Sequence, residues 1–196
     1  MEILLRIIIF VVLILTFTIS AFYRKRAREE GDMIERREEG IGVMIIRLFF
    51  GLSFLVVLLL NIFYPRILSW DKFSLPIYFQ YIGTAVAVGC VPLIWWVFKN
   101  IGKNTSETVL IKEDHELVIS GPYHWVRHPL YGTALLLLFS ISITFGDWIL
   151  LAGSLFGLIA FRLLVIPAEE KHLLDAYGEE YECYQARTGA LFPWIR

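Results

Sequence analysis

The sequence predicts an all-α polytopic membrane protein, and both its composition and its long apolar runs support that prediction. The chain has 196 residues, 57% of them hydrophobic, and its mean hydropathy is +0.63. A soluble domain of this length is much less apolar. A helix that crosses a bilayer needs about 20 mostly apolar residues. Five stretches reach or approach that length: 3–22, 43–63, 76–98, 130–145 and 148–166.

The first stretch is expected to be a retained transmembrane helix. Its apolar run from Ile3 to Phe22 is longer than a signal-peptide core, which spans about 7–15 residues. The basic residues follow the run instead of preceding it, which is the reverse of a secretory signal.

The fourth and fifth stretches are separated only by Gly146-Asp147. A glycine beside an aspartate indicates a tight turn, so we expect a helical hairpin over 130–166. The chain then divides into an N-terminal three-span membrane region, 1–98, and a second region, 99–196. The second region contains the hairpin and an amphipathic tail.

The positions of Lys and Arg predict how the helices are oriented. The 24–42 connection carries six Lys and Arg residues and the 99–129 connection carries four, but the 64–75 connection carries only two. With five spans, the two richer connections and the C-terminal tail share one face. Positive charge marks the cytoplasmic face, so this face is expected to be cytoplasmic. The shortness of the chain favours a prokaryotic cell membrane.

Composition also argues against several kinds of partner. The net charge is −1, and no basic block interleaved with aromatic residues suggests nucleic acid. Cys90 and Cys183 have no Cys or His neighbour at metal-ligand spacing, so no metal site is expected. The six basic residues of the 24–42 connection are matched by six acidic ones, which favours a solvated connector over a lipid-binding patch.

Residues 121–131 form the most informative motif, because prolines, histidines, an arginine and aromatic residues fall together at the edge of an apolar hairpin. Arg and His bind anions, aromatic rings cover flat or cationic groups, and Pro fixes the backbone. We therefore favour a ligand pocket over a plain helix start at Pro129. Before the motif, the alternation of Val109 with Ile111 and of Leu117 with Ile119 predicts two short extended pieces.

The end of the fifth stretch holds a second polar group. Arg162 lies about five residues before Pro167, which on a helix places it roughly 7–8 Å deeper in the membrane. There it either reaches the headgroups or holds an anion. Pro167 can start a helix whose first turn contains Glu169 and Glu170. Beyond them, apolar and tyrosine residues at helical spacing predict interfacial helices with a break at Gly178.

Four motifs together resemble the isoprenylcysteine carboxyl methyltransferase family. They follow one another in the order and spacing of that family, from about 108 to 194, which is nearly half of the chain. They are His115-Glu116-Leu117-Val118, Ser120-Gly121-Pro122-Tyr123, Arg127-His128-Pro129-Leu130-Tyr131 and Glu169-Glu170, followed by Tyr177-Gly178 and Arg187-Thr188-Gly189.

The resemblance implies a membrane-embedded methyltransferase that uses S-adenosyl-L-methionine. The region 99–196 would then be catalytic, with a cytoplasmic cofactor-binding loop. The family's cofactor pocket corresponds here to His115, Glu116, Leu117, Val118, Tyr123, His128, Pro129, Leu130 and Tyr131.

The methyl acceptor would be contacted by Arg162, Glu169 and Glu170. In the family the arginine aligns nearer to Val165, so Arg162 acts from a neighbouring position. The acceptor is expected to be lipophilic, such as a prenylated cysteine, and to arrive from the membrane lipid.

Three alternatives stay open at this point. A phospholipid amine N-methyltransferase would need Glu169 or Glu170 as a general base. An NADPH-dependent membrane sterol-type reductase shares the C-terminal pattern. A non-enzymatic transporter or chaperone would keep the pocket for another ligand, although no apolar stretch carries a central carboxylate for ion coupling.

Overall fold

The computed structural model describes residues 2–29, 41–101 and 117–193, with the side chains of 41–50 outside the description. Within these ranges the chain is helical. The α-helices are α1 (Glu2–Glu29), α2 (Ile41–Phe63), α3 (Ile77–Ile101), α4 (Pro129–Phe145), α5 (Trp148–Ala160), α6 (Ile166–Tyr177) and α7 (Glu179–Arg187).

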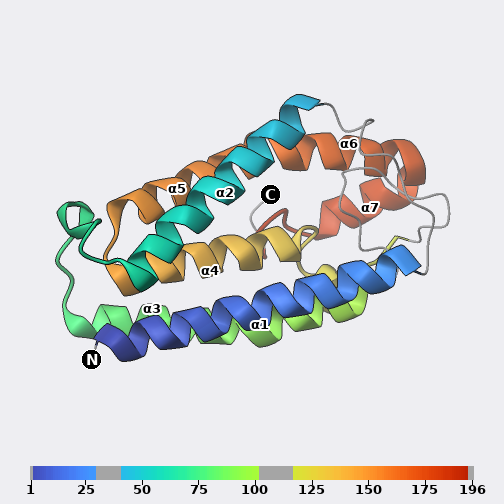
Figure 1. The fold of residues 1–196 in the computed structure, drawn as a ribbon. Helices are drawn as coiled ribbons and strands as arrows, with labels where there is room; N and C mark the ends of the chain where they lie inside the picture. Colours follow the sequence, from blue (N-terminus) through green and yellow to red (C-terminus); the bar gives the residue numbers. More distant parts are fainter. Residues whose placement is uncertain (1, 30–40, 102–116, 194–196) are drawn as a thin grey trace.

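The helices run lengthwise between two ends of the molecule (Figure 1). Helices α1, α3 and α4 lie side by side, and α2 crosses the bundle obliquely. The N-terminus, the start of α3 and the α4–α5 turn lie at one end. The C-terminal ends of α1 and α3, the start of α4, and helices α6 and α7 lie at the other. The connections that were expected to share one face therefore leave from one end of the bundle.

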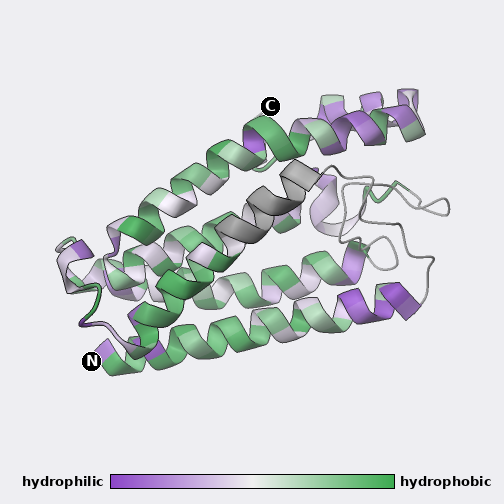
Figure 2. Ribbon diagram, turned by 45° about the horizontal axis from the view of Figure 1, so that its top comes forward, coloured by the Kyte–Doolittle hydropathy of each residue, from purple (hydrophilic) through white to green (hydrophobic). Residues whose placement is uncertain are grey.

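All five predicted apolar stretches are helical, which confirms the all-α polytopic fold. Among the described residues, three helices are long and apolar enough to cross a membrane: Glu2–Glu29, Ile77–Ile101 and the continuous helix Trp148–Tyr177. The apolar parts Gly51–Phe63 and Pro129–Phe145 are shorter. Figure 2 shows that the bodies of the helices are mostly hydrophobic (green), whereas the end formed by α6 and α7 is mostly hydrophilic (purple). That all five stretches span the membrane stays a prediction.

The core lies where α1, α3, α4 and α5 meet. Ile9, Cys90, Ile141 and Leu150 are fully buried and belong to one apolar cluster. Helices α3 and α4 approach closely at Gly83, where a Cβ would come 2.7 Å from the Ser140 carbonyl oxygen. Glycine is required there, because any side chain would force the two helices apart.

A buried polar network closes the end of the bundle at the α4–α5 turn. Gly146 ends α4 in the left-handed conformation, and the Asp147 side chain accepts from the Leu150 amide at 2.8 Å. Asp147 also accepts from Asn61 Nδ2 at 2.7 Å and from Lys72 Nζ at 3.0 Å. The predicted turn is confirmed, and the network additionally ties α2 and the α2–α3 loop to the hairpin.

The fifth apolar helix continues through Pro167 instead of restarting there. A π-helical turn, Phe161–Val165, joins α5 to α6, and Pro167 falls in the first turn of α6. Proline has no N–H to bond the preceding turn, and a π turn accommodates that loss. The predicted break at Gly178 is confirmed: its φ of 53° separates α6 from α7.

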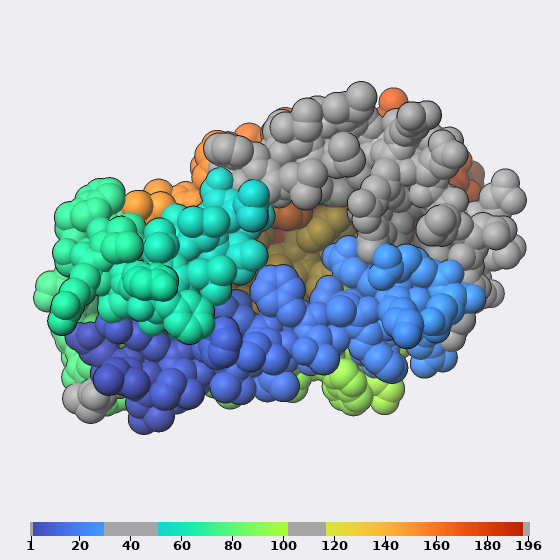
Figure 3. All heavy atoms as spheres, in the orientation of Figure 1, coloured from blue at the N-terminus to red at the C-terminus, as the bar shows by residue number. Residues whose placement is uncertain are grey.

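Two surface features complete the fold. Leu117 and Ile119 precede the 121–131 segment and belong to no helix or strand, so the extended piece predicted there stays a prediction. The piece around Val109 and Ile111 lies outside the described residues. In the space-filling view, the surface is hollowed between α1 and α2, and α4 forms the floor (Figure 3).

Candidate functional site

The site is built on the turn Gly121–His124, which folds against the end of α3. Gly121 has a φ of 60°, and a Cβ at this position would meet the end of the Asn100 side chain. The left-handed backbone conformation therefore favours glycine here. Tyr123 is buried in this turn, and Pro129 then begins α4.

A segment from the C-terminal part of the chain lies along the loop that joins this turn to α4. The Arg127 amide donates to the Gly189 carbonyl at 2.9 Å, and the His128 amide donates to the Ala190 carbonyl at 3.0 Å. The Tyr184 hydroxyl donates to the Tyr123 carbonyl at 2.6 Å. We call residues 188–191 the strap, because these bonds hold 123–128 against them.

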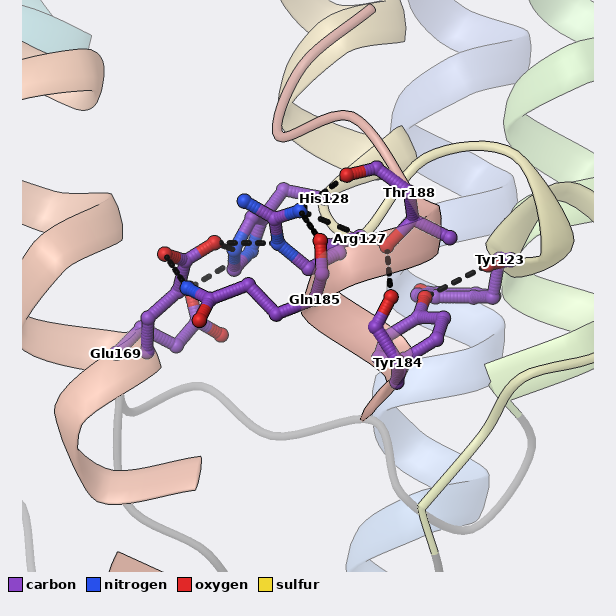
Figure 4. Close-up of polar contacts among 8 residues, drawn as sticks. Tyr123, Arg127, His128, Glu169, Tyr184, Gln185 and Thr188 are labelled. Carbon is purple, nitrogen blue, oxygen red and sulfur yellow. Dashed lines mark hydrogen bonds and ion pairs between the residues drawn. The ribbon is translucent and has the colours of Figure 1, made fainter. Parts of the chain in front are cut away.

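Arg127 lies at the centre of the polar contacts in Figure 4, and its side chain is 6% exposed. Its Nε donates to Glu170 Oε1 at 2.7 Å. Its Nη1 donates to the Gln185 carbonyl at 3.1 Å and to the Thr188 carbonyl. The Gln185 carbonyl lies in the last turn of α7, where carbonyls lack helical donors, and Thr188 directly follows the helix. Arg127 is therefore committed to protein groups and is not a free anion-binding arginine.

The adjacent carboxylates Glu169 and Glu170 both reach His128 from α6. Glu170 Oε1 lies 3.2 Å from His128 Nε2, and Glu169 Oε2 lies 3.5 Å from His128 Nδ1. Glu170 Oε2 accepts from the Gln185 amide at 3.0 Å. In contrast, Glu169 Oε2 is buried and makes no hydrogen bond with the described residues.

The His128 ring is buried between these carboxylates and an aromatic face. It stacks on Tyr131, with ring centroids 5.8 Å apart and an interplanar angle of 13°. Burial by itself lowers the pKa of His128, but the carboxylates of Glu169 and Glu170 outweigh it and raise that pKa. When His128 is protonated, it and Arg127 together balance the charges of the two carboxylates.

An aromatic contact extends the site toward α5. The Tyr131 ring lies 4.7 Å, centroid to centroid, from Phe161, the first residue of the π turn. Phe161 and Tyr131 also pack against the small apolar cluster of Leu135, Ile166 and Leu191. The strap, α4 and α6 thus meet in this cluster, and Tyr131 connects the cluster to His128.

The structure brings together some of the predicted site residues and separates others. His128, Tyr131, Glu169 and Glu170 form one group. Among the predicted cofactor residues, Tyr123 and Pro129 are buried beside it, while Leu117, Val118 and Leu130 are half-buried. Arg162 lies exposed on the π turn. His115 and Glu116 lie outside the described residues.

Sequence reasoning missed the parts of the site that come from the tail. Gln185 and Thr188 hold Glu170 and Arg127, and Tyr181 lies beneath them with its hydroxyl buried and without a hydrogen bond to the described residues. The break at Tyr177-Gly178 indicated that the chain changes direction in the tail. No local sequence pattern indicated that Gln185 would contact Glu170. In the described ranges no set of His, Cys, Asp and Glu side chains has the arrangement of a metal site.

The fold and the site define a class of protein: an integral membrane protein of apolar helices with a buried polar site at one end of the bundle. Residues 81–175 match the model of the isoprenylcysteine carboxyl methyltransferase (ICMT) family. This match, over just under half of the chain, confirms the resemblance seen in its motifs.

Individual relatives agree with the family match. The chain is 34% identical over 106 residues to the protein-S-isoprenylcysteine O-methyltransferase of Saccharomyces cerevisiae, covering 50% of this chain and 39% of that protein. It is 30% identical over 74 residues to methanethiol S-methyltransferase 1 of Bradyrhizobium diazoefficiens, covering 38% of this chain and 25% of that protein.

The fold is also found in a solved structure. The structure of the eukaryotic intramembrane Ras methyltransferase ICMT matches with a TM-score of 0.55 at 22% identity, covering 83% of this chain and 55% of that one. The chain thus spans well under two thirds of the length of these relatives, and at this identity the structural match establishes the fold alone.

Proposed function

We propose that this protein is a methyltransferase that uses S-adenosyl-L-methionine to methylate the carboxylate of a lipophilic acceptor, such as an isoprenylated cysteine. The observation that carries the proposal is His128, buried between Glu169 and Glu170 and stacked on Tyr131. The family match provides the reaction class. The position of the site, at one end of apolar helices, suits an acceptor that arrives from lipid.

The residues around His128 fit a cationic cofactor. Glu169 Oε2 is buried and makes only a 3.5 Å ion pair with His128 Nδ1, without a hydrogen bond to the described residues. It therefore keeps the capacity to accept from a ligand. Tyr131 and Phe161 supply aromatic surface for a ring or a sulfonium. When bound, the cofactor would supply an electrophilic methyl group on its sulfonium.

The protein itself would then have to position the cofactor and the acceptor and to exclude water from the site. A carboxylate acceptor is already ionised near pH 7, so its attack needs no general base. Fixed orientation of the two reactants contributes up to about 7–11 kcal/mol in the best intramolecular models. The rigid Arg127–Glu170–His128 group provides a frame of this kind.

The proposed contact with the acceptor falls on Arg162 and Glu169. Arg127 is buried and committed to Glu170 and two carbonyls, whereas Arg162 is exposed on the π turn. An exposed guanidinium can bind an acceptor carboxylate with paired hydrogen bonds. The hollow between α1 and α2 offers a lateral path for a lipid chain (Figure 3).

A thiol is the second candidate acceptor, because a relative named for methanethiol methylation is 30% identical over 74 residues. A thiol has a pKa of about 8.5 and would have to lose its proton. Glu169 is the carboxylate with an oxygen free to accept that proton. The phospholipid amine and NADPH alternatives lack a comparable observation.

The first experiment is calorimetric binding of S-adenosylhomocysteine to the detergent-purified protein. We expect micromolar binding that His128→Ala abolishes. His172→Ala is the matched control, since His172 lies exposed on α6, and it should bind like the wild type. Absence of binding by folded wild-type protein would overturn the proposed function, and NADPH binding would then support the reductase.

The acceptor is tested next with radiolabelled cofactor. Farnesylcysteine, methanethiol and phosphatidylethanolamine are offered in parallel, and we expect base-labile label on farnesylcysteine, as a methyl ester requires. Glu169→Gln and Arg162→Ala should reduce transfer while leaving cofactor affinity within a few fold. Labelled methanethiol product alone would favour the thiol reaction.

A further inference from the structure

The neighbouring carboxylates Glu169 and Glu170 have different surroundings, although both touch His128. Both oxygens of Glu170 are occupied: Oε1 lies 2.7 Å from Arg127 Nε and 3.2 Å from His128 Nε2, and Oε2 lies 3.0 Å from Gln185 Nε2. Glu169 Oε2 has only the 3.5 Å ion pair with His128 Nδ1 and makes no hydrogen bond with the described residues. A group whose acceptors are filled by the protein has little left for a ligand.

Arg127 extends the contacts of Glu170 to the C-terminal part of the chain. Its Nη1 reaches the carbonyls of Gln185 and Thr188. Thr188 Oγ1 in turn donates to the Tyr184 carbonyl at 2.7 Å. The end of α7 and the start of the strap are thus held by one guanidinium, whose charge suits the negative end of a helix.

The strap itself fixes the backbone of the residue at the centre of the site. The amides of Arg127 and His128 donate to Gly189 and Ala190. The same two residues contact Glu170 through their side chains. Displacement of the strap would therefore move the His128 backbone, and loss of Glu170 would release both Arg127 and Gln185.

We propose that Glu170 and Arg127 are positioning residues that lock the strap against the 123–128 loop, in contrast to Glu169, to which the proposed function already gives the contact with the acceptor. The role of Glu169 rests on the proposed function, which supplies the ligand. The role of Glu170 and Arg127 in holding the strap can be tested without any ligand. Arg127 and Glu170 act through Gln185, the strap and His128, and Glu169 acts on the ligand itself.

Charge explains why the pair should behave as a unit. Removing one member of a buried ion pair leaves the other charge buried and uncompensated, whereas removing both does not. We therefore expect Arg127→Gln and Glu170→Gln each to loosen the strap strongly. The double variant Arg127→Gln/Glu170→Gln should be no worse than the more damaging single variant.

Hydrogen–deuterium exchange in detergent tests the structural half. In Glu170→Gln, the amides of the strap and of 126–128 should exchange at least about ten-fold faster, because their opening free energy falls. Glu169→Gln, which differs by one position, should exchange like the wild type. Equal exchange in Glu170→Gln and the wild type would overturn the positioning role. Gln185→Ala gives a milder loss of the same kind if Glu170→Gln fails to fold.

Binding and turnover test the other half. Glu170→Gln should weaken S-adenosylhomocysteine binding about ten-fold, because it releases the backbone of His128. Glu169→Gln should bind the cofactor within a few fold and lose turnover by about a hundred-fold or more. Identical profiles for the two variants would refute the division. If wild-type protein bound no S-adenosylhomocysteine, the proposed function and the role of Glu169 would both fail. The exchange result would still show whether Glu170 and Arg127 hold the strap in place.

Discussion

Gly132→Ala should disturb the site from a position that touches no ligand. Gly132 lies in the first turn of α4, where a Cβ would fall 2.6 Å from the Leu191 carbonyl oxygen. Ordinary C···O contacts are about 3.3 Å or longer, so this oxygen would have to retreat by about 0.7 Å. Leu191 follows Ala190, whose carbonyl bonds the His128 amide at 3.0 Å, and that bond would lengthen with it.

The expected magnitude combines two opposing effects. Alanine in place of a helical glycine stabilises by about 0.5–1 kcal/mol, and overpacking costs about 1–3 kcal/mol. We expect a net loss of about 1 kcal/mol. For a protein of this size the melting temperature should fall by about 2–4 °C, and S-adenosylhomocysteine affinity should fall several-fold.

Thermal unfolding in detergent and calorimetry measure both quantities. Gly89→Ala is the matched control: Gly89 is also helical, but nothing lies within 4 Å of its added Cβ, so this variant should melt higher and bind normally. If Gly132→Ala behaved like Gly89→Ala, the close approach of the strap to α4 would be wrong.

Three further predictions concern buried polar groups. The pKa of His128 is raised in the folded protein. The stabilisation that protonated His128 provides is therefore complete below its unfolded pKa and is lost as pH rises through its folded pKa. The melting temperature, measured against pH, should fall over this interval in the wild type but not in His128→Gln. Asp147→Ala leaves Lys72 without its buried partner and α5 without its cap, and should cost more than about 2 kcal/mol in thermal unfolding. Tyr184→Phe removes a 2.6 Å hydrogen bond and should cost about 1 kcal/mol, whereas Tyr181→Phe removes a buried hydroxyl that lacks a described partner and should be neutral or stabilising. Equal melting of the two tyrosine variants would contradict that difference.

The helices were predictable because their signal is local. Runs of apolar residues, Gly146 before Asp147, and Gly178 after Tyr177 each determine nearby backbone, and the structure places helix ends at those residues. The motif 121–131 and Glu169-Glu170 likewise located most of the group around His128. That the helix would pass through Pro167 was not predictable from proline alone, since a π turn is one of several ways to accommodate it.

The remaining contacts were hidden because they join distant parts of the chain. Arg127 and Glu170 are 43 residues apart, and Asn61 and Asp147 are 86 apart. A basic residue at a helix start is equally compatible with a lipid headgroup, an anion or an internal carboxylate. Three-dimensional packing decides among these, and here it selected Glu170 and the carbonyls of Gln185 and Thr188.

The strap also separates membrane insertion from completion of the site in time. In the described part of the chain, residues 188–191 follow the three membrane-length helices, so they leave the ribosome after those helices have been made. A chain whose translation stopped at residue 187 would contain each apolar helix and could enter the bilayer. It would lack the carbonyls that hold Arg127 and His128 in place. Such fragments would occupy membrane as inactive protein, and quality control would have to recognise them by the loose loop before α4, not by exposed apolar helices.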